Sequence, residues 1–180
     1  MLSPKENDRI LDVCSAPGGK SFTSYLLTNG KSEIISCDKY EQRVNLIEKS
    51  SKKLGFTIKT IVNDATIFNE NLGFFDCVIC DVPCSGIGVI RRKPEIKYKD
   101  VNDFKELYDL QKNIIDVSLK YVNKGGKFLY STCTLNKKEN QEMVEYLLKN
   151  NPDFKLLEQK TILPKDFNGD GFFAAVLLRG

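Results

Sequence analysis

Short runs of β-branched and aromatic residues alternate along this chain with segments of helical periodicity, and this alternation is the strongest constraint on its fold. The expected strands end at polar or turn residues and span residues 9–13, 33–37, 58–62, 77–80 and 127–130. Helical spacing of apolar residues covers 41–54, 104–121 and about 136–149. This order predicts an α/β fold, a mostly parallel sheet covered by helices on both faces. Ligands of such sheets bind beyond the carboxyl ends of the strands.

The C-terminal segment departs from this pattern. Gly169-Asp170-Gly171 and the apolar run 172–178 predict a turn followed by a last strand, antiparallel at the edge of the sheet. No repeat or flexible linker divides the 180 residues, so a single domain is expected. Because the first strand begins about nine residues into the chain, an upstream part of a longer protein is also expected.

The composition limits the available chemistry because the chain contains no histidine. Ser-His-Asp catalysis, Cys-His catalysis and zinc sites that use imidazole are excluded, which leaves carboxylates, lysines, tyrosines and six cysteines as reactive groups. The net charge of +3 is compatible with a nucleic-acid partner. A polar N-terminus and no apolar run near roughly 18 residues predict a cytoplasmic protein with reduced thiols and no membrane partner.

A glycine-containing turn, Cys14-Ser15-Ala16-Pro17-Gly18-Gly19-Lys20, directly follows the first strand. Small residues at a strand-to-helix turn let a ligand approach the backbone and the free N–H groups of the helix. A phosphate loop is excluded because Cys14 stands where that motif needs glycine, and no dinucleotide fingerprint is present. Such a turn alone is equally compatible with a purely structural role.

Aspartates also follow the next three strands: Asp38, Asp64 and Asp81. Asp38 lies 19 residues after Gly19, close to the offset at which an acidic residue binds a ribose hydroxyl. Each aspartate alone could be a solvated turn residue. Together, along one edge of the sheet, they favour a cationic nucleoside ligand such as S-adenosylmethionine.

The cysteines divide into two groups by their expected positions. Cys77 and Cys80 form a Cys-x-x-Cys on a strand, where residues three apart point to opposite faces and cannot bind one metal ion. We therefore expect these two and Cys37 to be packing residues. Cys14 is expected to contact a ligand mainly through its backbone.

Cys84 and Cys133 follow the fourth and fifth strands and are expected to face one crevice beside Asp81. A free thiol has a pKa near 8.5, so a reactive thiolate needs nearby positive charge, for which Lys20 is the candidate. The alternative is a pair of buried, inert cysteines.

At this point the chain resembles the Sun (Fmu, RsmB) type of RNA cytosine-C5 methyltransferases along essentially its whole length. The turn 14–20 resembles the family's cofactor loop, Asp81-Val82-Pro83-Cys84-Ser85-Gly86 its Pro-Cys motif, and Ser131-Thr132-Cys133-Thr134 its Thr-Cys motif. Asp170-Gly171-Phe172-Phe173 resembles its terminal signature. The segment 88–95 is especially similar to bacterial enzymes that modify small-subunit ribosomal RNA. The resemblance implies a Rossmann-like, class I S-adenosylmethionine-dependent methyltransferase fold.

The resemblance also implies roles for individual residues. Cys133 would attack C6 of cytosine, Cys84 would assist release of the methylated RNA, and Asp81 would lie near both cofactor and base and stabilise protonation at N3. Asp38 would bind the ribose and Asp64 would lie near the adenine, with Arg43 a weaker candidate. The remaining implied cofactor contacts are Cys14, Ser15, Ala16, Pro17, Gly18, Gly19 and Lys20.

Basic residues cluster just after Cys84. They are Arg91, Arg92, Lys93, Lys97 and Lys99, accompanied by Tyr98. We expect this segment to hold the RNA backbone, with small-subunit ribosomal RNA as the partner, although a solvated loop is the alternative.

Several alternatives remain open at this stage. DNA cytosine-C5 methyltransferases use the Pro-Cys thiol as the nucleophile, which would give that role to Cys84; the additional Thr-Cys motif favours the RNA family. The RNA could be a tRNA or another species. A nicotinamide-dependent oxidoreductase or a non-catalytic RNA-binding module would share the general features. We expect a monomer formed by a single catalytic domain, residues 1–180, without the N-terminal RNA-binding domains usual in the family.

Overall fold

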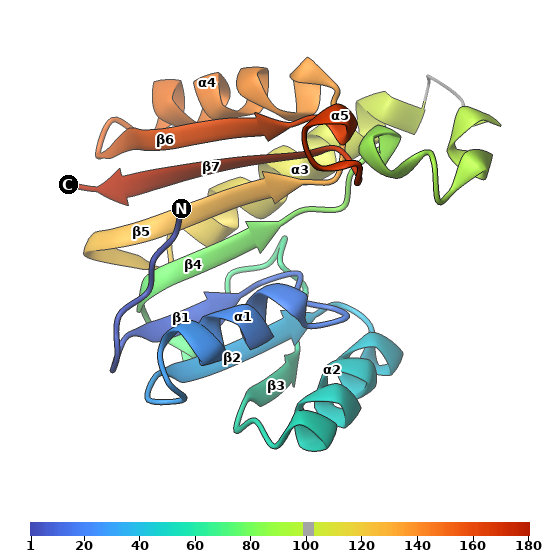
Figure 1. Ribbon diagram of the computed structural model, residues 1–180. Helices are drawn as coiled ribbons and strands as arrows, with labels where there is room; N and C mark the ends of the chain where they lie inside the picture. The colour runs from blue at the N-terminus through green and yellow to red at the C-terminus, as the bar shows by residue number, and fades with distance from the viewer. Residues whose placement is uncertain (99–102) are drawn as a thin grey trace.

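The computed structural model describes residues 1–98 and 103–180 and contains one seven-stranded sheet of order β3-β2-β1-β4-β5-β7-β6 (Figure 1). The strands are β1 (Arg9–Asp12), β2 (Glu33–Asp38), β3 (Lys59–Val62), β4 (Phe75–Asp81), β5 (Val122–Thr132), β6 (Phe154–Ile162) and β7 (Phe172–Arg179). The helices are α1 (Gly19–Leu27), α2 (Glu41–Leu54), α3 (Asp103–Leu119), α4 (Gln141–Asn150) and α5 (Pro164–Phe167). The α/β fold expected from the sequence is confirmed.

The strand order reverses at β1, which pairs in parallel with both β2 and β4. Because strand-helix-strand crossovers are right-handed, the reversal puts α1 in front of the sheet and α3 behind it in Figure 1. The carboxyl ends of β1 and β4 diverge at this switch point, where open α/β sheets bind their ligands.

The sheet separates two apolar cores. The larger one, on the side of α3 and α4, contains Cys80, Phe128 and Tyr130; the smaller one, on the side of α1, contains Ile10 and Cys77. Cys77 and Cys80 thus lie on opposite faces, as their spacing predicts. All six cysteines are free thiols.

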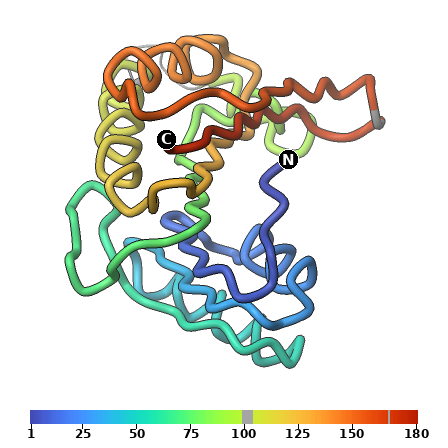
Figure 2. The backbone as a smooth tube through the Cα atoms, turned by 90° about the vertical axis from the view of Figure 1, so that its left-hand side faces the viewer, coloured from blue at the N-terminus to red at the C-terminus, as the bar shows by residue number. Residues whose placement is uncertain are grey.

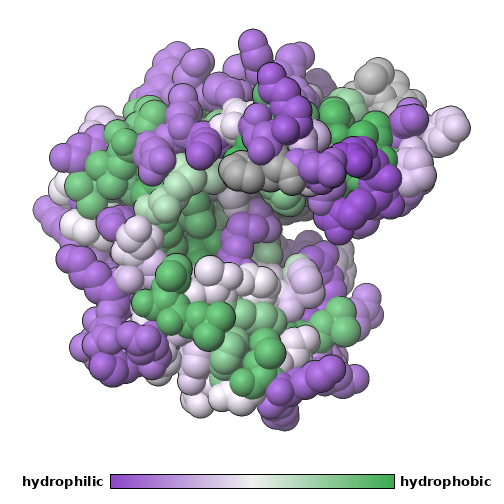
Figure 3. Space-filling view, viewed as in Figure 1, coloured by the Kyte–Doolittle hydropathy of each residue, from purple (hydrophilic) through white to green (hydrophobic). Residues whose placement is uncertain are grey.

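Helical cover on the α1 face is less complete than the sequence predicts. The first residues of the chain lie there, and the ammonium group of Lys127 on β5 donates to the carbonyl oxygen of Leu2 at 3.0 Å. A cavity of about 550 Å³ remains beside this segment, lined partly by Ile79, Leu129 and Ala174. Apolar surface therefore stays visible on this face (Figure 3).

The C-terminal strand β7 is antiparallel to β5, as expected, but a further strand covers its outer side. Figure 2 shows the chain turning back between β6 and β7, which pair antiparallel from Phe154–Arg179 to Ile162–Phe172. The edge position thus belongs to β6. Its mixed sequence, which includes Lys155, Glu158 and Lys160, lacks the alternation that would have predicted a strand.

Two local differences concern the segments after β4 and β5. Asn136 caps a short 3-10 turn, Lys137–Glu139, and α4 begins only at Gln141. After β4 two further 3-10 turns, Ile87–Val89 and Pro94–Tyr98, flank Arg91, Arg92 and Lys93, and the second turn contains Lys97. Lys99 lies outside the described residues. Within the described ranges, no helix is both long and apolar enough to cross a membrane.

Candidate active site at the carboxyl ends of β1, β4 and β5

The turn between β1 and α1 depends on its two glycines in different ways. Gly18 has a φ of 109°, and a Cβ there would lie 2.4 Å from the ring of Phe22, so only glycine fits. At Gly19 a Cβ would meet no atom within 4 Å. The backbone is therefore tightly packed against Phe22 at Gly18, whereas free space lies beside it at Gly19.

A buried polar network lies under this turn. The Ser21 hydroxyl donates to Asp12 at 2.8 Å. The hydroxyl oxygens of Ser15 and Ser36 lie 3.0 and 2.6 Å from that of Ser21. Burial raises the pKa of Asp12 to about 6. The second carboxylate oxygen of Asp12 is buried and has no hydrogen-bond partner within the described part of the chain. The sequence did not mark Asp12 as a site residue, although it is the last residue of the first strand.

The side chains of Asp38 and Arg43 meet beside the turn. The Arg43 guanidinium lies 3.1 Å from the Asp38 carboxylate and also donates to the carbonyl oxygen of Ala16 at 3.0 Å. The backbone N–H of Ala16 points to the same carboxylate at 3.4 Å. Asp38 is only 5% exposed, so this ion pair fixes a buried charge beside the turn.

Asp64 lies farther along the same edge of the sheet, beyond β3. Its carboxylate pairs with the ammonium group of Lys39 at 2.8 Å and accepts hydrogen bonds from the backbone and hydroxyl of Thr66. These contacts, the Lys39 hydrogen bond first, lower the pKa of Asp64 to about 2. Asp64 is therefore held as an anion.

Asp81 connects the turn to the segment after β5. One carboxylate oxygen lies 2.6 Å from the ammonium group of Lys20, and the other accepts the Ser131 hydroxyl at 2.6 Å. Lys20 comes from α1 and Ser131 from β5, two residues before Cys133. The switch point thus brings together a carboxylate, an ammonium group and the Thr-Cys segment.

The sulfur atoms of Cys84 and Cys133 lie 3.0 Å apart, and the Cys133 backbone N–H also donates to the Cys84 sulfur at 3.2 Å. The hydrogen bond from Cys84 lowers the pKa of Cys133, against the opposing effects of burial and Asp81. The same contact, together with burial, raises the pKa of Cys84. Lys20 also lowers the pKa of Cys133, but the Cys84 thiol is the main cause, which the sequence did not indicate. Of the two thiols, Cys133 therefore has the lower pKa.

A buried carboxylate supports both cysteine segments from behind. Glu139 is fully buried and accepts hydrogen bonds from the Ser85 backbone at 2.8 Å, the Gln111 amide at 3.0 Å and the Asn136 amide at 3.0 Å. Gln111 also donates to the carbonyl oxygen of Pro83 at 2.9 Å. The sequence placed Glu139 only near the start of an expected helix, because its contacts depend on the tertiary fold.

The segment after Cys84 is tied to the Cys133 loop through Gly88. Its backbone N–H donates to the Cys133 carbonyl oxygen at 3.1 Å, and its own carbonyl oxygen accepts from Gly171 at 2.8 Å. A Cβ at Gly88 would lie 2.1 Å from the Gly171 oxygen, so this approach requires glycine. The terminal Asp170-Gly171 signature and the Pro-Cys segment are therefore in direct contact.

The described basic side chains are exposed on this segment. Arg91 reaches Asn168 at 3.4 Å and Arg92 pairs with Asp170 at 2.5 Å, whereas Lys93 and Lys97 extend into solvent. Tyr98 is 88% exposed. The basic segment is thus exposed and follows the Cys84 loop closely in the chain.

This sheet order, its antiparallel β7 and the acidic strand ends around a glycine turn define the Rossmann-like class of S-adenosylmethionine-dependent methyltransferases. A family model described as 16S rRNA methyltransferase RsmB/F matches residues 1–178. The chain therefore belongs to the RsmB/F methyltransferase family.

Individual relatives agree with this assignment. The chain is 38% identical to a "Probable ribosomal RNA small subunit methyltransferase B" of Bacillus subtilis, over 96% of this chain and 43% of the relative. It is 34% identical to "Ribosomal RNA small subunit methyltransferase B" of Yersinia enterocolitica, over 99% of this chain and 44% of the relative. The chain thus spans less than half the length of these curated relatives.

A solved structure of NSun6 from Pyrococcus horikoshii with SFG superposes with a TM-score of 0.90 at 29% identity, over 99% of this chain and 49% of that one. A structure titled PH0851 superposes with a TM-score of 0.94 at 29% identity, over 98% of this chain and 43% of that one.

Proposed function

We propose that residues 1–180 form the catalytic domain of an S-adenosylmethionine-dependent enzyme that makes 5-methylcytosine in RNA, with small-subunit ribosomal RNA as the substrate. The observation that carries this proposal is the pair of sulfur atoms 3.0 Å apart beside Asp81, with the pKa of Cys133 lowered and that of Cys84 raised. The names of the relatives support ribosomal RNA. A cytoplasmic location is part of the proposal.

The residues around the turn fit S-adenosylmethionine, which is also supported by the SFG complex of the archaeal relative. The open space at Gly19 lets a ligand approach the backbone, and the adjacent carboxylates of Asp38 and Asp81 suit hydroxyl and cationic groups. In this proposal Asp38 binds the ribose of the cofactor and Asp64 lies near its adenine. The turn 14–20 contacts the rest of the cofactor. Arg43 acts by holding Asp38 and Ala16 in place. When bound, the cofactor supplies an electrophilic methyl group.

Cys133 starts the reaction because its lowered pKa favours the thiolate. Its sulfur bonds to C6 of cytosine while N3 takes a proton from solvent, and Asp81 stabilises this protonated N3, which leaves an electron-rich C5. C5 can then accept the methyl group. The target cytosine must be unpaired or flipped out to reach Cys133.

Cys84 completes the reaction after methyl transfer. Once the Cys133 sulfur is bound to C6 it no longer carries a negative charge, so the largest of the effects that raise the pKa of Cys84 is removed, while burial remains. Cys84 then loses its thiol proton to solvent, and its thiolate takes the proton from C5 as the bond between the Cys133 sulfur and C6 breaks and N3 gives up the proton it gained. This step restores the aromatic base and frees Cys133 as a thiolate.

Methylation of unmodified small-subunit ribosomal RNA with a radiolabelled methyl donor, followed by nucleoside mapping, tests the function. We expect label in 5-methylcytosine, and none with Cys133→Ala. The same assay on tRNA distinguishes the substrate. RNA binding without any labelled base would instead support a non-catalytic module and contradict the proposal.

A further inference from the structure

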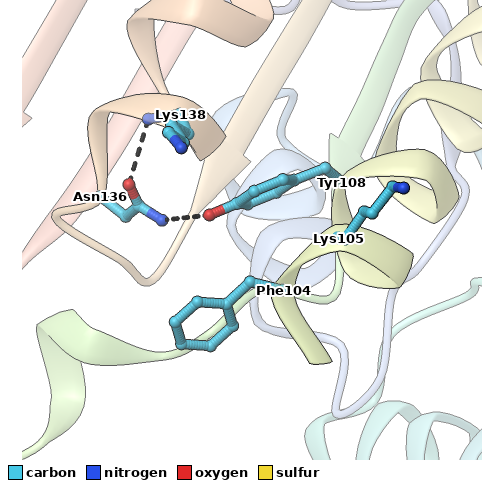
Figure 4. A pocket seen from close by; sticks show the side chains of 5 residues that line it. All are labelled: Phe104, Lys105, Tyr108, Asn136 and Lys138. Carbon is cyan, nitrogen blue, oxygen red and sulfur yellow. Dashed lines mark hydrogen bonds between the residues drawn. The ribbon is translucent and has the colours of Figure 1, made fainter. Parts of the chain in front are cut away.

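A cavity of about 540 Å³ lies between the start of α3 and the turn that follows β5, outside the cofactor turn and the cysteine pair. It is lined by Phe104, Lys105, Tyr108, Asn136 and Lys138 (Figure 4). Phe104 and Tyr108 are one helical turn apart on α3, and both rings project from the same side of the helix, with the Tyr108 phenol pointing to Asn136. The five lining residues include two aromatic rings and two ammonium groups but no acid.

The cavity wall is fixed by hydrogen bonds from one side chain. The Asn136 amide donates to the Tyr108 phenol at 2.9 Å and to Glu139 at 3.0 Å, and its oxygen accepts the Lys138 backbone N–H at 3.1 Å. Asn136 is therefore occupied in holding the wall. A ligand would meet chiefly ring surfaces and lysine side chains, which bind bases and phosphates without selecting a particular base.

The same wall continues into both cysteine segments. The Asn136 backbone N–H donates to the Thr134 hydroxyl at 3.2 Å, and that hydroxyl lies 2.8 Å from the Ser85 hydroxyl. Thr134 and Ser85 are the residues directly after Cys133 and Cys84. The cavity wall is therefore joined directly to the segments that carry the two cysteines.

We propose that this cavity binds a nucleotide that flanks the target cytosine in single-stranded RNA. The base stacks on the rings of Phe104 and Tyr108, and the phosphate pairs with Lys138 or Lys105 at the rim. Binding there would anchor the strand while the cytosine enters the active site. The inference rests on RNA being the substrate, as proposed above.

The test measures binding of the chain to short single-stranded RNA by fluorescence anisotropy. The probes are a uridine-rich oligonucleotide with one central cytosine and a series in which each flanking base in turn is removed to leave an abasic site. For the wild-type chain we expect removal of one particular flanking base to weaken binding by about 5- to 100-fold, the range of base–aromatic stacking.

Two aromatic variants then connect that base to the cavity. Phe104→Leu keeps apolar volume but removes the ring, so it should weaken binding of the intact RNA and lose the sensitivity to that abasic site. Tyr108→Phe removes the Asn136 contact but keeps the ring, and should bind nearly as the wild type does. Thermal unfolding of each variant separates a loss of stacking from a loss of folding.

Lysine variants test the cavity through the salt dependence of RNA affinity, without a substitution at the start of α3. Lys138→Ala should lower the slope of log affinity against log salt by about one, whereas the exposed Lys149→Ala on α4 should leave it unchanged. The inference is overturned if Phe104→Leu and Lys138→Ala bind RNA as the wild type does, or if the abasic effect persists in Phe104→Leu. Labelled methyl transfer measured in parallel reports separately on the proposed function.

Discussion

Cys84 and Cys133 differ in pKa, because the contact between their sulfur atoms lowers the pKa of Cys133 and raises that of Cys84. The sequence predicted that they would share a crevice beside Asp81, since all three follow neighbouring parallel strands. It could not predict which sulfur holds the proton, because that depends on a 3.0 Å contact between two loops. Asp12 and Glu139 escaped prediction for a related reason, as their importance comes from burial and from partners distant in sequence.

The asymmetry of the thiols predicts a pH dependence. Because the Cys84 hydrogen bond stabilises the thiolate, Cys133 should react with iodoacetamide with a midpoint below the ordinary thiol value of about 8.5, and lose reactivity as the pH falls through that midpoint. Cys84→Ala removes the donor and should move the midpoint upward. Peptide mass spectrometry at a series of pH values measures this. An unchanged midpoint in Cys84→Ala would contradict the account.

The connections between strands and helices set the site more than the strands themselves do. The turn after β1, the Pro-Cys segment after β4 and the Thr-Cys segment after β5 were all identified from their residues. The edge strand β6 was not predicted because its charged residues break the alternation. The 3-10 turns around the basic segment were also beyond prediction, since tertiary contacts such as those of Gly88 determine their path.

Alanine substitution of the two glycines in the β1–α1 turn should affect different properties, stability at Gly18 and cofactor binding at Gly19. Gly18→Ala introduces both an unfavourable positive φ, at roughly 1 to 2 kcal/mol, and an overlap with Phe22, so it should lower the unfolding temperature. Gly19→Ala has room for its Cβ and should fold normally, but should bind the cofactor product S-adenosylhomocysteine more weakly because it fills the approach to the turn. Thermal denaturation and calorimetric titration measure the two effects. A Gly18→Ala protein as stable as the wild type would show that the turn does not need glycine there.

At the scale of the whole molecule, charge and family membership support the RNA substrate proposed above. The net charge of +3 is small, so affinity for RNA should come from local groups of basic residues rather than from the overall charge of the chain. The fold class and family followed from the sequence because several motifs match along the whole chain. The cavity at the start of α3 did not, because its lining comes from two segments that meet only in the folded protein. The monomeric state stays a prediction.

The basic segment makes a prediction about salt. Lys93 and Lys97 extend into solvent, whereas Arg92 pairs with Asp170. Lys93→Ala and Lys97→Ala together should weaken binding to small-subunit ribosomal RNA, and each phosphate that is no longer neutralised should reduce the slope of log affinity against log salt by about one. Binding titrations between low and moderate salt measure this slope. An identical slope would assign the segment to solvent alone.

The most direct measurement of the central claim is the covalent adduct between enzyme and RNA. The account assigns bond formation to Cys133 and release to Cys84, so Cys84→Ala incubated with RNA and S-adenosylmethionine should form a complex that survives a denaturing gel. Cys133→Ala and the double variant should form none. A stable adduct with Cys133→Ala, and none with Cys84→Ala, would make Cys84 the nucleophile and contradict the mechanism.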